Sequence, residues 1–141
     1  DVCSSDLRIR KVTYISGDTW NVNPIALKRI KQLFCKNERA VIECEINSLD
    51  QKPNSVLTLV PVAAILVASI RLHFINLLLH LKYQGPNQIT CNETVIRGEE
   101  LGWFQHGSTI IVFAPHGYQL LKNLTLGRQI LMGEALFEHL I

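Results

Sequence analysis

A chain of 141 residues is long enough for one domain with a modest core, and its composition gives no sign of a second domain. The net charge of +2, without a basic cluster interleaved with aromatic residues, argues against nucleic acid as a partner. Hydrophobic residues make up 48% of the chain, which is high for a soluble domain and favours a protein that works at a membrane or a piece of a larger protein.

The first seven residues, Asp1 to Leu7, show no apolar period and no targeting signal. They resemble the peptide encoded by a common sequencing-library adapter. We therefore expect residues 1–7 to be a non-native tail and the native sequence to begin near Arg8.

The four cysteines lie far apart and form no C-x-x-C pair, which argues against a zinc site and against a disulfide-stapled scaffold. His73, His80, His116 and His139 show no metal-ligand spacing either. The sequence therefore predicts free thiols and no metal site.

Three elements are predicted before residue 48. Lys11–Ile15 is typical of a short strand that stops at the turn residues Ser16-Gly17-Asp18. One short helix is expected near residues 24–34, with Asn23 as its cap and its apolar side chains on one face. Residues 40–46 alternate between apolar and acidic side chains, which predicts a strand with one solvated side.

Residues 56–81 are the most apolar region and allow two interpretations. A membrane-spanning helix needs about 20 apolar residues without interruption, whereas Pro61 and Arg71 interrupt this run. Because Val, Ile and Thr are frequent, we predict two core strands instead, Val56–Leu59 and Ala63–Leu72. Arg71 is then expected to extend its charged end to solvent.

The next segment, Phe74–Leu81, is predicted to be a third strand or a loop that touches lipid. Further strands are expected at Ile89–Ile96 and Ser108–Ala114, each bounded by turn residues.

One short pattern occurs twice: Gly98-Glu-Glu-Leu101 recurs as Gly133-Glu-Ala-Leu136, each time as a turn before a new strand. Short strands separated by such turns predict a mainly β fold. We expect a compact β-barrel or sandwich of short strands with one short helix near residues 24–34.

The bond between Gly107 and Ser108 has a possible chemistry of its own. The Ser108 hydroxyl can attack the Gly107 carbonyl, and glycine tolerates the strained backbone that exposes this carbonyl. Elimination across Ser108 then breaks the chain and leaves dehydroalanine, which hydrolyses to a pyruvoyl group. Such a group reacts with a substrate amine and accepts electrons as carbon dioxide leaves. By itself a Gly-Ser-Thr tripeptide is most often a turn, so only the surrounding sequence can indicate whether this bond reacts.

Three motifs in order supply that context: Leu33-Phe-Cys-Lys-Asn-Glu-Arg39, the apolar stretch Val60–Ile70, and Gly98–Thr109. Together they resemble the C-terminal half of phosphatidylserine decarboxylase proenzymes. In that family a Leu-Phe-x-x-Asn-Glu-Arg stretch and a Val-Gly-Ala-x-x-Val-Gly-Ser-Ile-like strand precede a Gly-Ser-Thr cleavage site. Residues 16–23 also resemble the family's Pro-Gly-Asp-x-Phe-Ser-Val-Asn, so the resemblance covers nearly all of residues 8–141.

The resemblance implies self-cleavage between Gly107 and Ser108, then decarboxylation of phosphatidylserine to phosphatidylethanolamine and carbon dioxide. Residues 8–141 are then the C-terminal part of a single catalytic domain that is α+β in the full parent. The large chain ends at Gly107, and the small chain begins at Ser108, which becomes the pyruvoyl cofactor. The implied partners are phosphatidylserine, an anionic membrane and the two chains themselves, and the implied location is the cytoplasmic face of a bacterial plasma membrane.

The base that activates the serine is not part of these motifs. In the family it comes from an upstream His-x-x-His-like motif and an acidic partner, so we expect this chain to be inactive by itself. His106 is the candidate base within the chain, although a packing role is the simpler interpretation of its position. Ala63 and Ala68 stand where the family has glycines, which is expected to narrow the pocket.

Two alternatives belong to other classes of function. One is a β-barrel binding module that keeps the shape of the family without the cleavage. The other is a small membrane-anchored protein that spans the bilayer with Val56–Leu81.

Overall fold

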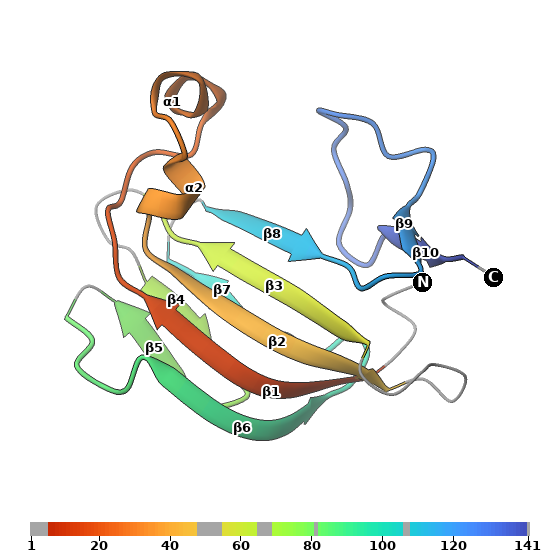
Figure 1. The fold of residues 1–141 in the computed structure, drawn as a ribbon, viewed down its shortest axis with the longest axis horizontal. Coiled ribbons are helices and arrows are strands. Elements are labelled where there is room, and N and C mark those ends of the chain that lie inside the picture. The colour runs from red at the N-terminus through yellow and green to blue at the C-terminus, as the bar shows by residue number, and fades with distance from the viewer. Residues whose placement is uncertain (1–5, 48–54, 65–68, 81, 106–107, 141) are drawn as a thin grey trace.

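The computed structural model describes residues 6–47, 55–64, 69–80, 82–105 and 108–140 (Figure 1). Its helices and strands, in chain order, are β1 (Asp6–Ile15), α1 (Pro24–Arg29), α2 (Leu33–Lys36), β2 (Arg39–Asn47), β3 (Val56–Val62), β4 (Ser69–Leu72), β5 (Leu77–His80), β6 (Gln88–Val95), β7 (Gly102–Phe104), β8 (Thr109–Phe113), β9 (Tyr118–Leu120) and β10 (Phe137–His139). Because β1 includes Asp6 and Leu7, the strand begins inside the segment predicted to be a non-native tail, and the origin of that tail stays a prediction.

The strands form two main antiparallel sheets. The larger has the order β6-β1-β2-β3-β8, the smaller has the order β5-β4-β7, and β9 pairs with β10. The smaller sheet lies behind the larger one (Figure 1), and the core between them joins Val12 and Ile42 to Ile70 and Leu79. Within the described residues the edge strands β6 and β8 do not pair with each other. The mainly β sandwich is therefore confirmed, and a closed barrel is not formed.

Strand β2 confirms the alternation in its sequence. Ile42 and Cys44 are buried in the core, while Glu43 and Glu45 face outward. The outward carboxylates pair with β1, since Lys11 Nζ lies 2.8 Å from Glu43 Oε1 and an Arg10 nitrogen lies 2.7 Å from Glu45 Oε2. Exposed ion pairs contribute at most about 1 kcal/mol each, so the buried side chains supply most of the stability of this strand.

The single helix predicted near residues 24–34 was wrong in its extent, because two short helices occupy this region. Asn23 caps α1 as predicted, and its Oδ1 accepts a hydrogen bond of 2.8 Å from the Ala26 backbone N–H. Between α1 and α2, Gln32 adopts a left-handed conformation with φ of 55°. The chain already leaves the helix at Ile30, which is extended, and it restarts as α2 after Gln32.

The apolar face predicted for this helix was also wrong. Ile25 and Leu27 are 61% and 38% exposed, and α1 buries no residue. Leu33 of α2 is buried, so this region contacts the body of the protein through α2 rather than through α1.

Strand β3 extends past its predicted end at Leu59 and runs through Pro61 to Val62. Proline has no N–H to donate, and the ladder between β2 and β3 has no paired residues between Leu59 and Val62. On the other side, Pro61 lies opposite Ile110 of the edge strand β8. The sheet therefore accommodates a proline next to its edge.

The predicted strand Ala63–Leu72 is shorter in the structure, where β4 begins at Ser69, and residues 65–68 lie outside the described residues. The third strand expected within Phe74–Leu81 is confirmed as β5, which forms a hairpin with β4. No helix in the described part of the chain is long and apolar enough to cross a bilayer.

The two Gly-Glu patterns form the same turn. Gly98 and Gly133 both have positive φ, of 85° and 81°, which favours glycine at these positions. In each turn the glutamate closes the loop: Glu99 Oε2 accepts from the Ile96 N–H at 3.1 Å, and Glu134 Oε2 accepts from the Leu131 N–H at 3.0 Å. The short strands β7 and β10 follow, as the repeated pattern predicted.

Candidate functional site

Ser108 lies directly before β8, at one edge of the larger sheet, and is partly buried. Strand β8 pairs with β3, so that Thr109 lies opposite Val62. The other two predicted site residues, His106 and Gly107, lie outside the described residues. The role of His106 as a base and the cleavage at Gly107 therefore stay predictions.

The period of the strand determines the direction of the Ser108 side chain. Successive side chains of a strand point to opposite faces, so Ser108 belongs to the same face as Ile110 and Val112. Ile110 lines a pocket between the two sheets, and Val112 packs against the core. Ser108 is thus the next residue beyond Ile110 on the face that is turned toward the smaller sheet.

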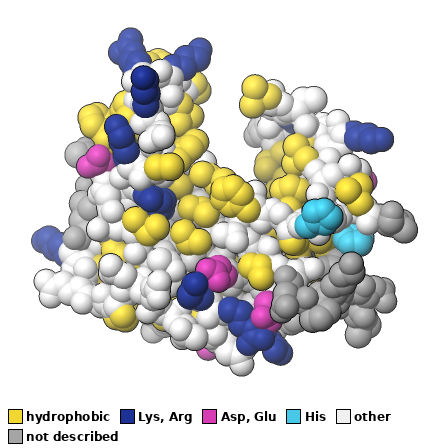
Figure 2. Space-filling view, viewed as in Figure 1, with side chains coloured by type: hydrophobic (Ala, Val, Ile, Leu, Met, Phe, Trp, Pro, Cys, Tyr) yellow, Lys and Arg dark blue, Asp and Glu magenta, His cyan; other side chains and the backbone are white. Residues whose placement is uncertain are grey.

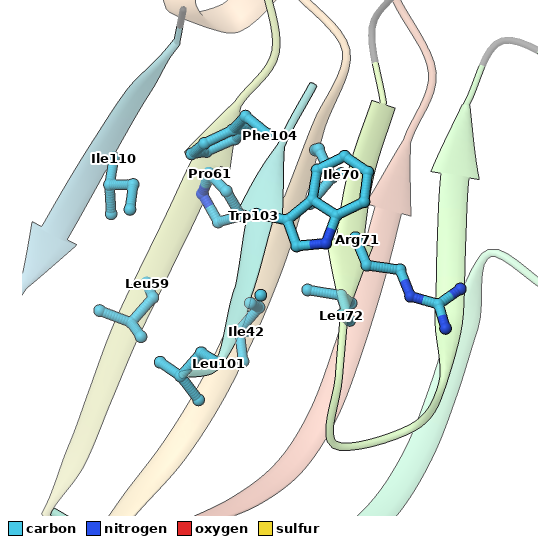
Figure 3. Close-up of a pocket in the computed structure, with 11 residues that line it drawn as sticks. Ile42, Leu59, Pro61, Ile70, Arg71, Leu72, Leu101, Trp103, Phe104 and Ile110 are labelled. Atoms are coloured by element: carbon cyan, nitrogen blue, oxygen red, sulfur yellow. The ribbon is translucent and has the colours of Figure 1, made fainter. Parts of the chain in front are cut away.

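The pocket beside Ser108 is small and apolar, with a volume of about 70 Å³ (Figure 3). Both sheets line the pocket. The larger sheet contributes Ile42, Leu59, Pro61 and Ile110. The smaller sheet contributes Ile70, Arg71, Leu72, Gly102, Trp103 and Phe104, and Leu101 directly precedes its strand β7. Because β7 ends at Phe104 and β8 begins at Thr109, the segment that contains Ser108 joins two walls of this pocket.

Arg71 is the one charged residue among those that line the pocket, and its head group is directed away from the apolar lining (Figure 3). The guanidinium donates a hydrogen bond to Asn76 Oδ1 at the surface. This position agrees with the prediction that Arg71 extends its charged end to solvent.

Ser69 and Gln105 hold the segment that leads to Ser108. Ser69 is buried and its Oγ donates a hydrogen bond of 2.7 Å to Gln105 Oε1, while the Gln105 backbone N–H donates to the Ser69 carbonyl at 3.4 Å. Sequence reasoning missed this contact, although Ser69 lies in the apolar motif and Gln105 in the motif that contains Ser108. The contact attaches the chain before Ser108 to strand β4.

Asn37 connects three segments near the same end of the larger sheet. Its side chain is fully buried and donates to the carbonyls of Trp20 at 2.7 Å and Ala63 at 2.9 Å. It also accepts a hydrogen bond of 3.0 Å from the Trp20 N–H. Because Ala63 follows Val62, which lies opposite Thr109, Asn37 fixes the backbone that supports the start of β8.

Two other motif residues pack against the C-terminal end of helix α2. Arg39 Nη1 donates to the carbonyls of Cys35 at 2.8 Å and Asn37 at 2.9 Å, which satisfies the open end of α2. Gly17 packs against the same end, and a Cβ on Gly17 would lie 2.2 Å from the Lys36 carbonyl oxygen. The Ser-Gly-Asp and Asn-Glu-Arg motifs therefore build one structural unit.

Glu38 is a fully buried acidic residue. It is 0% exposed, and neither carboxylate oxygen has a hydrogen-bond partner among the described residues. Burial raises the pKa of Glu38, and the nearby Tyr14 hydroxyl and His80 offset part of this rise. The Tyr14 hydroxyl itself donates to the His80 backbone carbonyl at 3.3 Å. Folding thus shifts the protonation equilibrium of Glu38 toward the neutral form.

Glu38→Gln is expected to change how stability depends on pH. A carboxyl whose pKa is raised by folding stabilises the fold below its unfolded pKa, and this stabilisation is lost as the pH rises through the folded pKa. The variant and the parent chain should therefore be equally stable near pH 4. Toward alkaline pH the variant should become more stable by about 1–3 kcal/mol, measured by urea unfolding across a pH series.

Glu43→Gln is the matched control, since Glu43 is partly exposed and paired with Lys11. It should lower stability near neutral pH by less than about 1 kcal/mol, which is the opposite direction. A Glu38→Gln variant that is never more stable than the parent chain at any pH would contradict the assignment of Glu38 as a buried acid whose pKa is raised by folding.

The remaining charged candidates are dispersed. His73 Nδ1 lies 3.5 Å from Glu100 Oε1 at the surface, and His139 packs edge-on against Tyr118. The described residues hold no group of three or more His, Cys, Asp or Glu side chains that could bind a metal. Glu99 belongs to a turn, as described above, which agrees with its predicted structural role.

Comparisons with known proteins agree with the motifs. A family model described as phosphatidylserine decarboxylase matches residues 3–138. The phosphatidylserine decarboxylase proenzyme of Haemophilus influenzae is 31% identical, over 93% of this chain and 45% of its own length. The proenzymes of Campylobacter jejuni and Brevibacillus brevis are 34% and 29% identical, over 93% and 87% of this chain and 47% and 43% of their own lengths. No solved structure gives a significant match.

The matched proenzymes are much longer than this chain, which spans about half the length of the curated relatives. All three matched motifs and the Gly107–Ser108 bond lie inside the region matched by the family model.

Proposed function

Because the chain belongs to the phosphatidylserine decarboxylase family, we propose that it is part of a self-processing carboxy-lyase that converts phosphatidylserine to phosphatidylethanolamine and carbon dioxide. The observation that carries this proposal is the position of Ser108. It lies directly before an edge strand and two residues before Ile110, which lines an apolar pocket, and motif residues restrain the chain on both sides of it.

The contacts on either side of Ser108 suit a serine whose hydroxyl attacks the carbonyl of the preceding residue. Ser69 and Gln105 restrain the chain before the reactive bond, and the pairing of Thr109 with Val62 restrains the chain after it. Such restraint lowers the entropic cost of bringing a hydroxyl onto the preceding carbonyl. We place the activating base in the rest of the longer protein, with His106 as the alternative within this chain.

The residues present also fit a pyruvoyl group at position 108. That group supplies an electron-accepting carbonyl for the decarboxylation of a bound amino acid. The apolar side chains of the nearby pocket offer a less polar surface than water, which favours the loss of charge when a carboxylate leaves as carbon dioxide. Arg71 lines the pocket but directs its guanidinium away from the apolar side chains, toward Asn76 at the surface.

The remaining parts of the proposal concern partners and location. The large chain ends at Gly107 and the small chain begins at Ser108, and the two stay together because β8 is paired with β3 across the cut. The substrate is a membrane lipid, so we place the whole protein at the surface of an anionic membrane, on the cytoplasmic face of a bacterial plasma membrane.

Incubation of the full-length protein with phosphatidylserine vesicles tests this function. We expect phosphatidylethanolamine and carbon dioxide to form, and we expect sodium borohydride to abolish the reaction because it reduces the carbonyl at position 108. Binding of the vesicles without release of carbon dioxide would instead favour a non-catalytic binding module.

A further inference from the structure

Helix α1 presents apolar side chains to solvent. Trp20, Ile25 and Leu27 are 49%, 61% and 38% exposed, and none of the six residues of α1 is buried. Figure 2 shows hydrophobic side chains together with Lys and Arg side chains over this end of the molecule. An exposed group of large apolar side chains usually marks a contact surface.

The charges of the same segment indicate which kind of partner this surface can bind. Residues 19–37 contain four exposed basic side chains, Lys28, Arg29, Lys31 and Lys36, and no acidic one. The nearest exposed acid is Asp18, whose carboxylate accepts a hydrogen bond of 3.1 Å from the Trp20 ring N–H. At about 100° per residue, Lys28 projects between Ile25 and Leu27, while Ala26 faces the opposite way. Exposed apolar side chains together with several cations suit contact with the surface of an anionic lipid bilayer.

The position of α1 relates this exposed surface to the proposed reactive residue, Ser108. Asn37, which ends α2, donates to the Ala63 carbonyl, and Ala63 follows Val62, the partner of Thr109. Figure 1 likewise shows α2 close to the start of β8, with α1 projecting beyond it. A membrane that contacts α1 therefore lies at the same end of the sandwich as Ser108.

We propose that α1 docks on an anionic phospholipid bilayer and thereby orients the Ser108 end of the sandwich toward the lipid. Ile25, Leu27 and the ring of Trp20 enter the interfacial region, and the four basic side chains contact phosphate groups. The inference rests on the proposed function in one respect, because that function explains why the protein would approach a membrane. Docking itself requires neither cleavage nor decarboxylation.

Co-sedimentation of the 141-residue chain with vesicles tests the charges. Vesicles with equal parts of phosphatidylcholine and phosphatidylglycerol avoid the proposed substrate, so that surface docking is measured by itself. The chain should bind these vesicles and not pure phosphatidylcholine, and Lys28→Gln with Arg29→Gln should weaken binding about twenty-five-fold. The matched control, Arg97→Gln with Lys122→Gln, changes exposed residues outside this segment and should retain most of the binding.

The two tryptophans test the orientation, because Trp20 and Trp103 are almost equally exposed, at 49% and 45%. In the Trp103→Phe variant, bilayers with brominated acyl chains should quench the emission of Trp20. In the Trp20→Phe variant the remaining Trp103, which lines the pocket rather than the docking surface, should be quenched less than Trp20. Equal quenching of both, or equal binding to neutral and anionic vesicles, would overturn the proposal.

Two further outcomes distinguish a membrane from a second copy of the chain as the partner of α1, and docking from catalysis. If charge changes in α1 alter the oligomeric state in size-exclusion chromatography and leave vesicle binding unchanged, α1 contacts another copy of the chain and the proposal is wrong. If the vesicles bind as expected while the full-length protein stays uncut, the docking surface stands and the proposed lyase function fails.

Discussion

Ser108→Ala in the full-length protein that carries this sequence is expected to leave the chain uncut and without decarboxylase activity. Alanine removes the only atom of residue 108 that can attack the Gly107 carbonyl, so neither the ester nor the later elimination can form. The expected effect is a complete loss of processing, measured as a single band on a denaturing gel.

Two neighbouring variants control this result. Ser108→Cys keeps a nucleophile at the same position and should restore part of the cleavage. Thr109→Val removes the next hydroxyl, which points to the other face of β8, and should leave cleavage largely intact. Cleavage that persists in Ser108→Ala, or that is lost equally in Thr109→Val, would contradict Ser108 as the nucleophile.

Asn37→Ala is expected to produce the largest loss of stability among substitutions in the described motifs. The change leaves the carbonyls of Trp20 and Ala63 and the N–H of Trp20 without the partner they have in the parent chain. An unsatisfied buried polar group costs about 1–3 kcal/mol, so we expect the free energy of unfolding to fall by about 3 kcal/mol. Urea unfolding of the 141-residue chain measures this value.

Asn92→Ala is the matched control, since Asn92 is an exposed asparagine whose Oδ1 accepts one hydrogen bond from Arg10 at 2.8 Å. It should change stability by less than about 0.5 kcal/mol. Asn37→Asp separates size from hydrogen bonding, because it keeps an acceptor for the Trp20 N–H and loses both donors. If Asn37→Asp is as stable as the parent chain, the donors to Trp20 and Ala63 do not matter and the assignment of Asn37 is wrong.

The strands could be predicted where one local pattern dominated. In β2, Ile42 and Cys44 alternate with Glu43 and Glu45, and a strand with one buried side is the arrangement that satisfies both sets. The paired turns at Gly98 and Gly133 were equally predictable, because glycine is favoured at the positive φ that each turn requires.

The helical region could not be predicted in the same way. Ile25 and Leu27 belonged with Ile30 and Leu33 to an approximate apolar face, yet both are exposed, since an apolar pattern alone does not distinguish a core from a contact surface. The break from Ile30 to Gln32 arises from backbone conformations that no local residue pattern demands. The extension of β3 through Pro61 depends on a partner strand, β8, which is distant in the sequence.

The candidate site was predictable in its reactive residue and not in its supports. Gly107-Ser108-Thr109 carries the chemistry in three adjacent residues, so the sequence was sufficient to identify Ser108. The contact of Ser69 with Gln105 joins residues 36 positions apart in the sequence. The burial of Glu38 likewise depends on how the sheets close around it, which only the fold reveals.

The mass of the full-length protein under denaturing conditions tests the central claim most directly. The proposal predicts two chains that divide between Gly107 and Ser108, with the small chain lighter by one ammonia than a peptide that begins with Ser108. A single uncut chain, or a small chain that retains a free N-terminal serine, would contradict it.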